Sequence, residues 1–484
     1  MGAILTMKVK GKIPLYSWPG SIKNEFSKFI RINKAKRKET KNSLDCIPAD
    51  GQDIYNYVAR YRIANFQTQA VMKLDGRLEF DKLSKAVRLS FDVEPVFGCR
   101  FIESIRPHWK QIKDIDYVEF CTFEETDNPD TAVEKFLDTP LDLDKGPMAK
   151  VKLIRSGPDD IVCVKVSHVC CDGAGAKEYF LLLADIYSQI DKDSSGYIPV
   201  QHIPNKNDRN RMYKALNIDA SQAIYNSKPK IVHQLWKFPW RNNRLGATRF
   251  VVCKLPEGQL DEMKSYSKAR GATINDLMLT AVYRAMFEIS KPPYGVPVDI
   301  PITLDLRRYL PDQKTEAIRN FAGGYVTTIA RKKHETFPET LKRVMSETKI
   351  LKDGRLKTED IAWAEGVENT NFYQYTSYFK AVSLLADMAS NNPLIDFTDK
   401  CSVVFANLGF VSKSLIKFGE HTVTDAYVLP PVIRAPGILL IATTYNGIIT
   451  LGVGYYKPSV HRSAMENLLN KIKDELIEGC KQPS

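Results

Sequence analysis

Alternation of apolar and polar residues predicts strands along the chain, and apolar residues three and four positions apart predict the helices between them. Residues 64–74 are expected to form a strand that ends at a turn, and residues 79–91 the helix after it. Residues 149–155 and 161–167 are predicted to form a hairpin, whose second strand is almost continuously apolar, as a strand buried on both faces is. A helix with an apolar stripe is predicted over residues 174–190.

The second half of the chain repeats this alternation of strands and helices. Thr273 is expected to cap a helix, because Asp276 stands three residues further on in a capping-box position. The other expected elements are strands near 98–104, 115–120, 248–254, 298–304, 322–330, 401–406, 437–444 and 447–455, and helices at 258–269, within 337–390 and at 460–478. Two comparable halves of mixed strands and helices indicate a two-domain α/β (α+β) protein.

A long polar stretch separates the two halves. Residues 191–245 are rich in charged residues and prolines and contain few apolar runs. The predicted organisation is therefore a basic arm over 1–45, an N-terminal half over 46–195, a linker over 196–245 and a C-terminal half over 246–484.

Composition excludes several classes of protein. Of the 484 residues, 44% are hydrophobic and 26% are charged, which is ordinary for a globular protein and excludes extended disorder. The sequence contains no apolar run long enough to predict a transmembrane helix. The nine cysteines form no CxxC pair and no cluster with histidines at zinc spacing, so we expect a reduced, cytoplasmic protein without a metal site.

The positive charge is concentrated in the N-terminal arm. The net charge is +12, and residues 1–41 contribute +9 of it, with 11 basic and 2 acidic residues. The nearly neutral body argues against nucleic-acid binding. Ile22, Phe26, Phe29 and Ile30 fall on one face of a predicted helix. That helix either packs against the body or makes a weak contact with an anionic membrane surface.

The best candidate for chemistry is the stretch SHVCCDG over residues 167–173. His168 falls where a buried strand is predicted to end, and Asp172 and Gly173 fall where the next helix begins. A histidine in this position can project into a cleft, and its ordinary pKa of about 6.5 makes it a proton acceptor at neutral pH. Asp172 suits a helix N-cap, and Gly173 permits a tight backbone. On the pattern alone, a buried structural histidine beside a capping aspartate is the simpler interpretation.

The HxxxDG pattern of His168 to Gly173 resembles the motif of the coenzyme-A-dependent acyltransferase superfamily. That superfamily includes nonribosomal-peptide condensation domains, chloramphenicol acetyltransferase and alcohol O-acyltransferases. Other stretches agree with the family in the same order, namely FQTQAVMKLDGRLEFDKLSKAVRLSF, PLDLDKGPMAKVKLIR, GATINDLMLTAVYRA, ITLDLRRYLP and NFAGGYVTTI. The resemblance covers about residues 50–478.

The resemblance implies a fold and a reaction. The fold is expected to be two chloramphenicol-acetyltransferase-like domains in a V-shaped pseudo-dimer, with the active site in the channel between them. The implied reaction moves an acyl group from a thioester to a hydroxyl or an amine, with His168 as general base. The donor is acyl-CoA or a phosphopantetheinyl thioester, and no tightly bound cofactor is implied. We expect a free-standing, monomeric enzyme with a small-molecule donor and acceptor, and an acyl carrier protein is a further candidate partner.

The resemblance also assigns a role to the motif aspartate. In the family this residue pairs with an arginine and is not a second catalytic group. Arg307, in DLRRYL, is the candidate partner of Asp172, and Arg308 is the alternative. Gly173, Asp172 and Arg307 are therefore expected to support the site structurally.

The sequence departs from the family pattern at two places, and two other interpretations of its function stay open. Ser167 stands where condensation domains usually carry the first of two adjacent histidines, and the DFGWG motif of plant-type acyltransferases is not found. Cys170 or Cys171 could instead act as a thiol nucleophile with His168 as its base. A second class of function is a condensation-like binding module that has lost catalysis and recruits a partner.

Overall fold

The computed structural model describes residues 46–61, 65–190, 197–204, 207–218, 236–352, 367–368, 371–390 and 401–481. The predicted basic arm, with Ile22, Phe26, Phe29 and Ile30, lies outside the described residues, as does part of the predicted linker over 196–245. The described strands form two six-stranded sheets and one three-stranded sheet.

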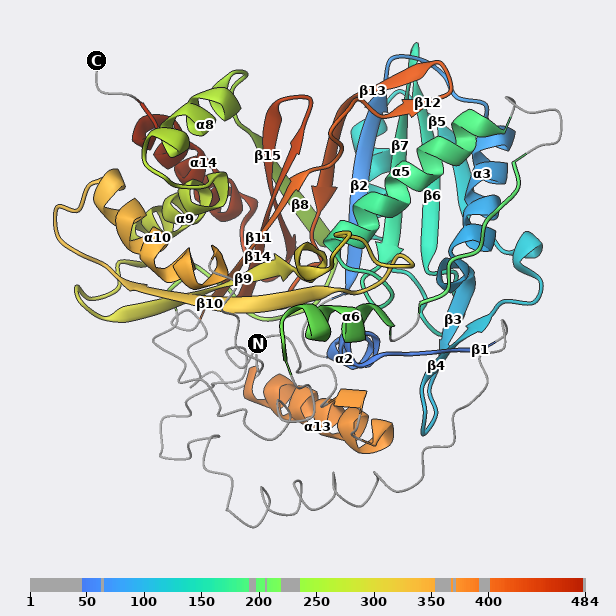
Figure 1. The fold of residues 1–484 in the computed structure, drawn as a ribbon, viewed down its shortest axis with the longest axis horizontal. Helices are drawn as coiled ribbons and strands as arrows, with labels where there is room; N and C mark the ends of the chain where they lie inside the picture. The colour runs from blue at the N-terminus through green and yellow to red at the C-terminus, as the bar shows by residue number, and fades with distance from the viewer. Residues whose placement is uncertain are drawn as a thin grey trace.

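The first lobe is built on a six-stranded sheet whose strands come from both ends of the chain (Figure 1). In spatial order these are β12 (Lys417–Phe418), β13 (His421–Leu429), β2 (Gln67–Leu74), β7 (Asp159–Ser167), β6 (Ala149–Ser156) and β5 (Cys121–Glu125). Helices α3 (Phe80–Val93) and α5 (Gly173–Gln189) pack together over the sheet, and α4 (Pro129–Asp138) packs against β6 and β7. Because β12 and β13 belong to the predicted C-terminal half, the sheets do not divide at the predicted linker.

The second lobe is built on the other six-stranded sheet. Its strands are β10 (Ala322–Ala330), β9 (Pro297–Asp305), β11 (Ser402–Phe410), β14 (Gly437–Tyr445), β15 (Ile448–Tyr456) and β8 (Thr248–Lys254). Its helices are α8 (Gln259–Ala269), α9 (Ile274–Ser290), α10 (Phe337–Lys352) and α14 (Arg462–Gly479), and α9 packs against the other three. Thr273 and Asp276 form the predicted capping box at the start of α9.

Smaller elements lie at the base of the two lobes (Figure 1). They are the three-stranded sheet of β1 (Cys46–Pro48), β4 (His108–Gln111) and β3 (Cys99–Ile102), and helices α2 (Gly51–Ala59), α6 (Asn207–Ala215) and α13 (Phe372–Ser390). Helix α13 packs on α2, and α6 packs on the 3₁₀ helix η5 (Leu306–Tyr309). These elements join the two lobes near the start of β2.

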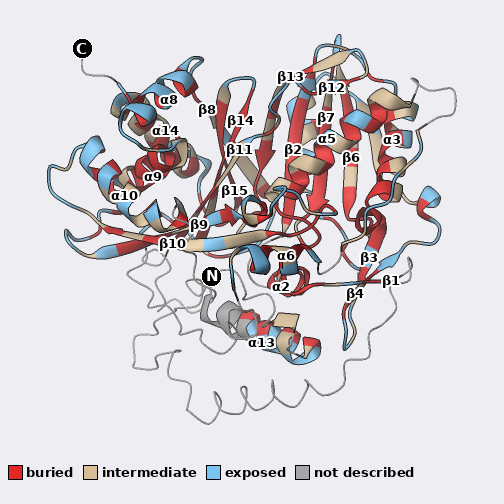
Figure 2. Cartoon of the chain, in the orientation of Figure 1, coloured by how far each residue is buried: buried red, intermediate tan, exposed pale blue. Residues whose placement is uncertain are grey.

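The two lobes stand side by side as the arms of a V, which confirms the predicted fold class (Figure 1). Figure 2 shows that β2 and β7, the two central strands of the first sheet, are buried along most of their length. The predicted hairpin of β6 and β7 and the helix after it are also confirmed, since α5 begins at Gly173 and ends at Gln189.

The strand expected near residues 115–120 is wrong. The chain forms the 3₁₀ helix η4 (Ile115–Tyr117) there, and β5 begins only at Cys121. Ile115 is buried, but Tyr117 is 91% exposed, so the apparent alternation of apolar side chains does not face one core. Helices α2, α4 and α6 and strands β1, β4, β12 and β13 were not predicted.

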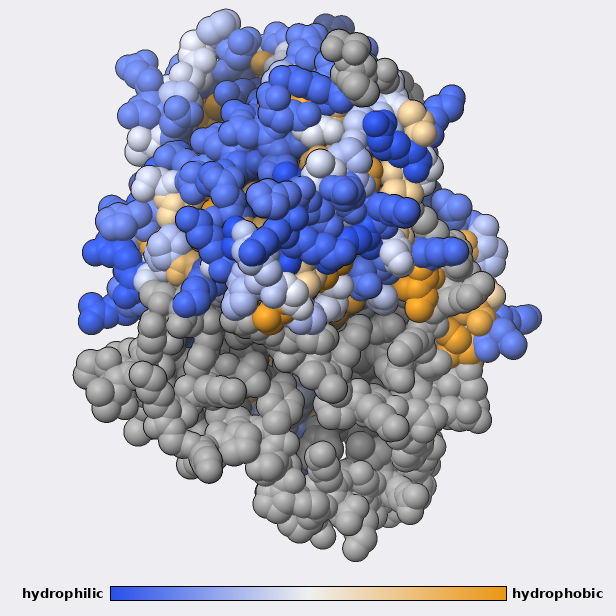
Figure 3. All heavy atoms as spheres, turned by 90° about the vertical axis from the view of Figure 1, so that its left-hand side faces the viewer, coloured by the Kyte–Doolittle hydropathy of each residue, from blue (hydrophilic) through white to orange (hydrophobic). Residues whose placement is uncertain are grey.

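The outer face of the second lobe is largely hydrophilic where the structure describes it (Figure 3). Among the described residues, no helix combines the length and the apolar character needed to cross a lipid bilayer.

Candidate active site

His168 stands one residue beyond the end of β7, which lies between β2 and β6 in the first sheet. β7, the strand that leads to His168, is held rigidly because its Val162, Val164 and Val166 are completely buried. The main-chain N–H of His168 donates to the carbonyl oxygen of Phe66 at 2.7 Å. The residue itself is half-buried. The fold therefore holds the His168 main chain and leaves part of the residue accessible.

Two neighbouring side chains border the His168 imidazole. The Phe66 ring meets it edge-on, with the ring centroids 5.8 Å apart. Nδ2 of Asn56 lies 3.5 Å from Nδ1 of His168, which is long for a hydrogen bond. Burial lowers the pKa of His168, although a hydrogen bond with its own main chain, the Asp172 charge and Asn320 oppose this shift. The imidazole is therefore neutral at pH 7 and able to accept a proton.

Asp172 caps α5 and is tied to the second lobe. Its carboxylate accepts the main-chain N–H of Gly175 at 2.8 Å and that of Phe321 at 2.6 Å. Nη1 of Arg307 lies 3.0 Å from Oδ2 and 3.2 Å from Oδ1 of the same carboxylate. Burial by itself would raise the pKa of Asp172, but the Arg307 charge and these hydrogen bonds outweigh burial and hold the pKa below its ordinary value. Asp172 is thus a buried carboxylate whose contacts order the loop.

The structure brings Arg307, rather than Arg308, against Asp172. The Arg307 side chain is buried, and its Nη2 donates to the main-chain oxygen of Arg319 at 2.9 Å. Its Nε lies 3.3 Å from Oε1 of Glu178 on α5. Arg308 is exposed. Arg307 therefore links the start of α5 to the second lobe, and Arg308 does not share that position.

Gly173 and Ser167 shape the two ends of the loop. A Cβ on Gly173 would lie 2.6 Å from Cδ2 of Leu408, so the glycine allows β11 of the second lobe to approach α5 closely. Ser167 is completely buried, and its Oγ accepts the N–H of Val169 at 3.1 Å. The serine thus closes the turn from within, which gives its hydroxyl a structural use.

The two loop cysteines are poorly suited to act as nucleophiles. Cys170 and Cys171 are both buried, and Sγ of Cys170 donates to the carbonyl of Ser167 at 3.1 Å. Burial raises the pKa of the Cys170 thiol well above its ordinary value, which disfavours the reactive thiolate.

Sequence reasoning missed two polar side chains that hold the main chain of the loop between β7 and α5. Nδ2 of Asn56, on α2, donates to the carbonyl oxygen of His168 at 2.8 Å. Nδ2 of Asn320 donates to the carbonyl oxygen of Val169 at 2.7 Å. The one available signal was the capping box of α2, in which Asp50 caps the helix and Asp53 returns the contact.

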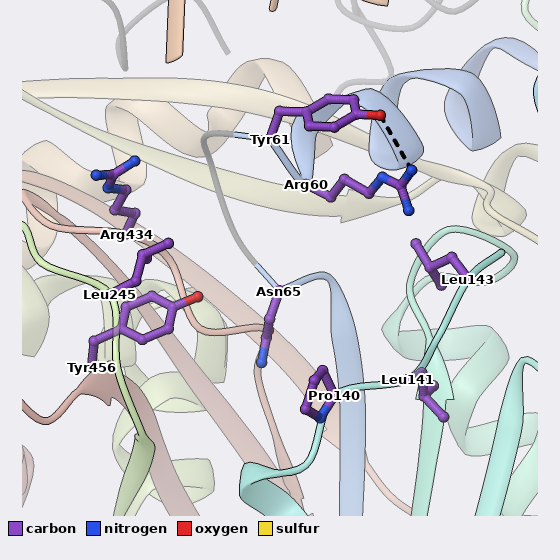
Figure 4. Close-up of a pocket in the computed structure, with 9 residues that line it drawn as sticks. All are labelled: Arg60, Tyr61, Asn65, Pro140, Leu141, Leu143, Leu245, Arg434 and Tyr456. Carbon is purple, nitrogen blue, oxygen red and sulfur yellow. Dashed lines mark hydrogen bonds between the residues drawn. The ribbon is translucent and has the colours of Figure 1, made fainter. Parts of the chain in front are cut away.

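A pocket of about 200 Å³ lies where the two lobes meet (Figure 4). Its lining residues are Arg60, Tyr61, Asn65, Pro140, Leu141, Leu143, Leu245, Arg434 and Tyr456. Asn65 directly precedes Phe66, whose carbonyl holds His168, so the pocket borders the strand end next to the candidate base. His168 itself is not one of the lining residues.

Comparisons with known proteins identify a family and a fold. The family model described as "Condensation domain" matches residues 62–361, well over half of the chain. A comparison with curated protein sequences gives no match.

Solved structures of the same fold cover nearly the whole chain. The first condensation domain of the calcium-dependent antibiotic synthetase, in complex with a substrate analogue, is 14% identical, with a TM-score of 0.65 over 91% of this chain and 98% of that one. The TRI3 trichothecene 15-O-acetyltransferase from Fusarium sporotrichioides is 13% identical, with a TM-score of 0.63 over 92% and 98%. The epimerization domain from the third module of tyrocidine synthetase B is 16% identical, with a TM-score of 0.61 over 90% and 97%.

Proposed function

Because the chain belongs to the condensation-domain family, we propose that it is an acyltransferase. It moves an acyl group from a thioester, carried by coenzyme A or by an acyl carrier protein, to a hydroxyl or an amine. His168 is the general base, and Asp172, Gly173 and Arg307 hold the loop that carries it. The observation that carries the proposal is the setting of His168 at the end of a rigid, buried strand, half-buried and with a lowered pKa.

The reaction needs one proton acceptor and accurate placement. His168 removes the proton from the acceptor hydroxyl or amine as the acceptor attacks the thioester carbonyl, and the tetrahedral intermediate then collapses and expels the thiolate. The proton held by the imidazole returns to the departing sulfur, so the imidazole is neutral again at the end. General base catalysis of this kind typically contributes about 10²–10⁴-fold in rate.

The lowered pKa of His168 supports this role, because a neutral imidazole is the form that accepts a proton. The contacts of Asp172 support a different role for the carboxylate. Both oxygens are engaged by Arg307, and Gly175 and Phe321 add main-chain N–H donors. Asp172 is therefore assigned to the structure of the loop.

The alternative is a condensation-like module that binds a carrier protein or another partner without catalysis. An accessible neutral histidine favours the enzyme. The neighbour described as an epimerization domain nevertheless shows that this fold alone does not fix the reaction.

The test is a thiol-release assay with acyl-CoAs of several chain lengths against pooled alcohols and amines, run in parallel with an acylated carrier protein as donor. Acceptor-dependent release is expected from the wild type and from His461→Ala, and not from folded His168→Ala. His461 is exposed and its side chain makes no capping hydrogen bond, so it is a matched control. Equal release by His168→Ala would remove His168 as the base. A folded wild type that releases no thiol from any donor would favour the binding module.

A further inference from the structure

The loop between β7 and α5 leaves the sheet at His168 and does not enter the helix until Gly173. Main-chain carbonyls in such a loop need partners other than the sheet ladder. The first two carbonyls of the loop find them in side-chain amides, because His168 O accepts from Asn56 at 2.8 Å and Val169 O accepts from Asn320 at 2.7 Å.

The two amides reach the loop from different elements. Asn56 lies on α2, and Asn320 lies in the second lobe, just before β10. Both are buried. They also contact each other, because Nδ2 of Asn56 donates to Oδ1 of Asn320 at 3.3 Å, and Nδ2 of Asn320 reaches Oδ1 of Asp53 at 3.2 Å.

The segment that carries Asn320 is itself anchored at both ends. The N–H of Phe321 donates to Asp172, at the far end of the loop, at 2.6 Å. Nη2 of Arg319 lies 2.6 Å from Oδ2 of Asp50, the residue that caps α2. The two amides are therefore held in one buried frame, which touches the loop at its beginning and at its end.

This arrangement also bears on the orientation of the imidazole. Nδ2 of Asn56 has two N–H groups and faces three acceptors, and the shorter contacts go to His168 O and Asn320 Oδ1. Nδ1 of His168, at 3.5 Å, is the most distant of the three. Nδ1 still lies next to Asn56, so this ring nitrogen is on the side of the two amides. Nε2 is then the nitrogen that can meet a substrate.

We propose that Asn56 and Asn320 form an amide clamp that positions His168 by holding the carbonyls of His168 and Val169. The two asparagines are positioning residues, since they act through the loop and not on the substrate. The inference rests on the proposed function, because a positioned base matters only to an enzyme that uses it. Since one amide comes from the second lobe, the orientation of the base depends on how the two lobes fit together.

The donor N–H groups are the feature that the clamp requires. Asn320→Asp keeps the size of the side chain but places a carboxylate oxygen against Val169 O and Asp53, where an N–H now donates. Asn56→Ala removes the other amide and suits a helix interior, so α2 should still form. Asn56→Gln keeps an amide on a longer side chain and tests partial rescue. Asn128→Ala is the matched control, because it removes an exposed asparagine that caps α4, away from the loop.

The first measurement is kinetic and uses the donor and acceptor found by the thiol-release assay. Asn56→Ala and Asn320→Asp are expected to lower kcat by on the order of 10²-fold, as a misplaced catalytic group does, with KM little changed. Asn56→Gln should recover part of the loss, and Asn128→Ala should keep wild-type kcat. Wild-type kcat in both clamp variants would overturn the proposal.

The second measurement does not depend on activity. The protein has seven histidines, and labelling them with ¹⁵N allows the His168 imidazole signals to be assigned by their loss in His168→Ala. The clamp predicts that Asn56→Ala and Asn320→Asp each shift the His168 nitrogen resonances and change the ratio of its tautomers, and that Asn128→Ala does not. Unchanged His168 signals in folded clamp variants would overturn the clamp even if the wild type is active. Shifted signals in a protein without thiol release would support the clamp and overturn only the enzymatic function.

Discussion

Helices α5 and α9 are both 17 residues long and pack over the sheets of their respective lobes, but their N-termini are built differently. At α9, Thr273 and Asp276 cap each other, and Asp276 also accepts from Thr348 of α10 in the same lobe at 2.6 Å. At α5, the capping Asp172 is held by Arg307 and Phe321, which belong to the other lobe.

The difference separates a local helix start from one that depends on assembly of the whole molecule. The cap of α9 is complete once its own lobe has folded. The cap of α5, and with it the loop that carries His168, reaches its final geometry only when the second lobe is in place. A loop supported from both lobes can present one histidine accurately to a substrate lying between them.

The largest effect is expected from His168→Ala. Loss of the base should lower acyl transfer by about 10²–10⁴-fold without a change in melting temperature, because His168 is half-buried and its main-chain contacts remain. Initial rates of thiol release and a melting curve on the same preparation measure both quantities, with His461→Ala as control. Turnover at the wild-type rate in folded His168→Ala would show that the loop before α5 does not supply the base.

The next largest effect is expected from Asp172→Ala and Arg307→Ala. Each removes one member of the buried Asp172–Arg307 pair, and breaking such a pair typically costs about 3–5 kcal/mol of unfolding free energy. The cost should be the smaller for Asp172→Ala, because Arg307 keeps its contacts with Glu178 and Asp305. Both variants should therefore melt at a lower temperature or give less soluble protein. They should also lose activity, because the loop that carries His168 is no longer held in place. Arg308→Ala should behave as the wild type, since Arg308 is exposed. An Asp172→Ala protein of full stability that lacks only turnover would show that the carboxylate acts in the chemistry.

Acid should affect the α5 cap through Asp172. Its pKa in the folded protein lies below the ordinary 3.8, so its stabilising contribution is complete above that pH and is lost as the pH falls through the folded pKa. Denaturation of the wild type and of Asp172→Asn between pH 6 and pH 3 measures this contribution as the difference between the two curves. We expect the difference to narrow as the pH falls below about 4. A difference that stays constant over this range would mean that Asp172 stabilises the fold without its charge.

The smallest effect is expected at the local cap. Thr273→Ala should cost about 1 kcal/mol of unfolding free energy, as the loss of a helix N-cap does. Turnover should be unchanged, because the cap of α9 does not contact the His168 loop. Activity that falls in proportion to stability in this variant would show that the two helix starts are coupled after all.

The sequence predicted the elements whose apolar pattern matches their burial. β7 and α5 fall into this group, because Val162, Val164 and Val166 of β7 and the apolar stripe of α5 pack into the same hydrophobic core. The capping box of α9 was also predictable, since its two residues are three positions apart. His168 and Asp172 were found because a strand end and a helix start meet in a short motif.

The remainder depends on contacts between residues far apart in the chain. Helix α2 carries buried polar residues where an amphipathic helix would carry apolar ones, and Asp53 and Asn56 are satisfied by the distant Asn320. The pattern of residues 51–59 does not reveal that partner. Strand β13 was missed for another reason, because a register shift between Val423 and Asp425 interrupts its period of two.

The position of β13 has a consequence for the order in which the molecule folds. β13 pairs along almost the whole length of β2, yet the two strands are separated by most of the sequence. During synthesis the N–H and C=O groups on the β2 edge of the first sheet therefore stay unpaired until residues 421–429 leave the ribosome. Pairing of such distant segments is slow, and an open edge attracts other strands in the meantime. We therefore expect a fragment that stops before β13 to aggregate, even though it contains the complete HxxxDG loop.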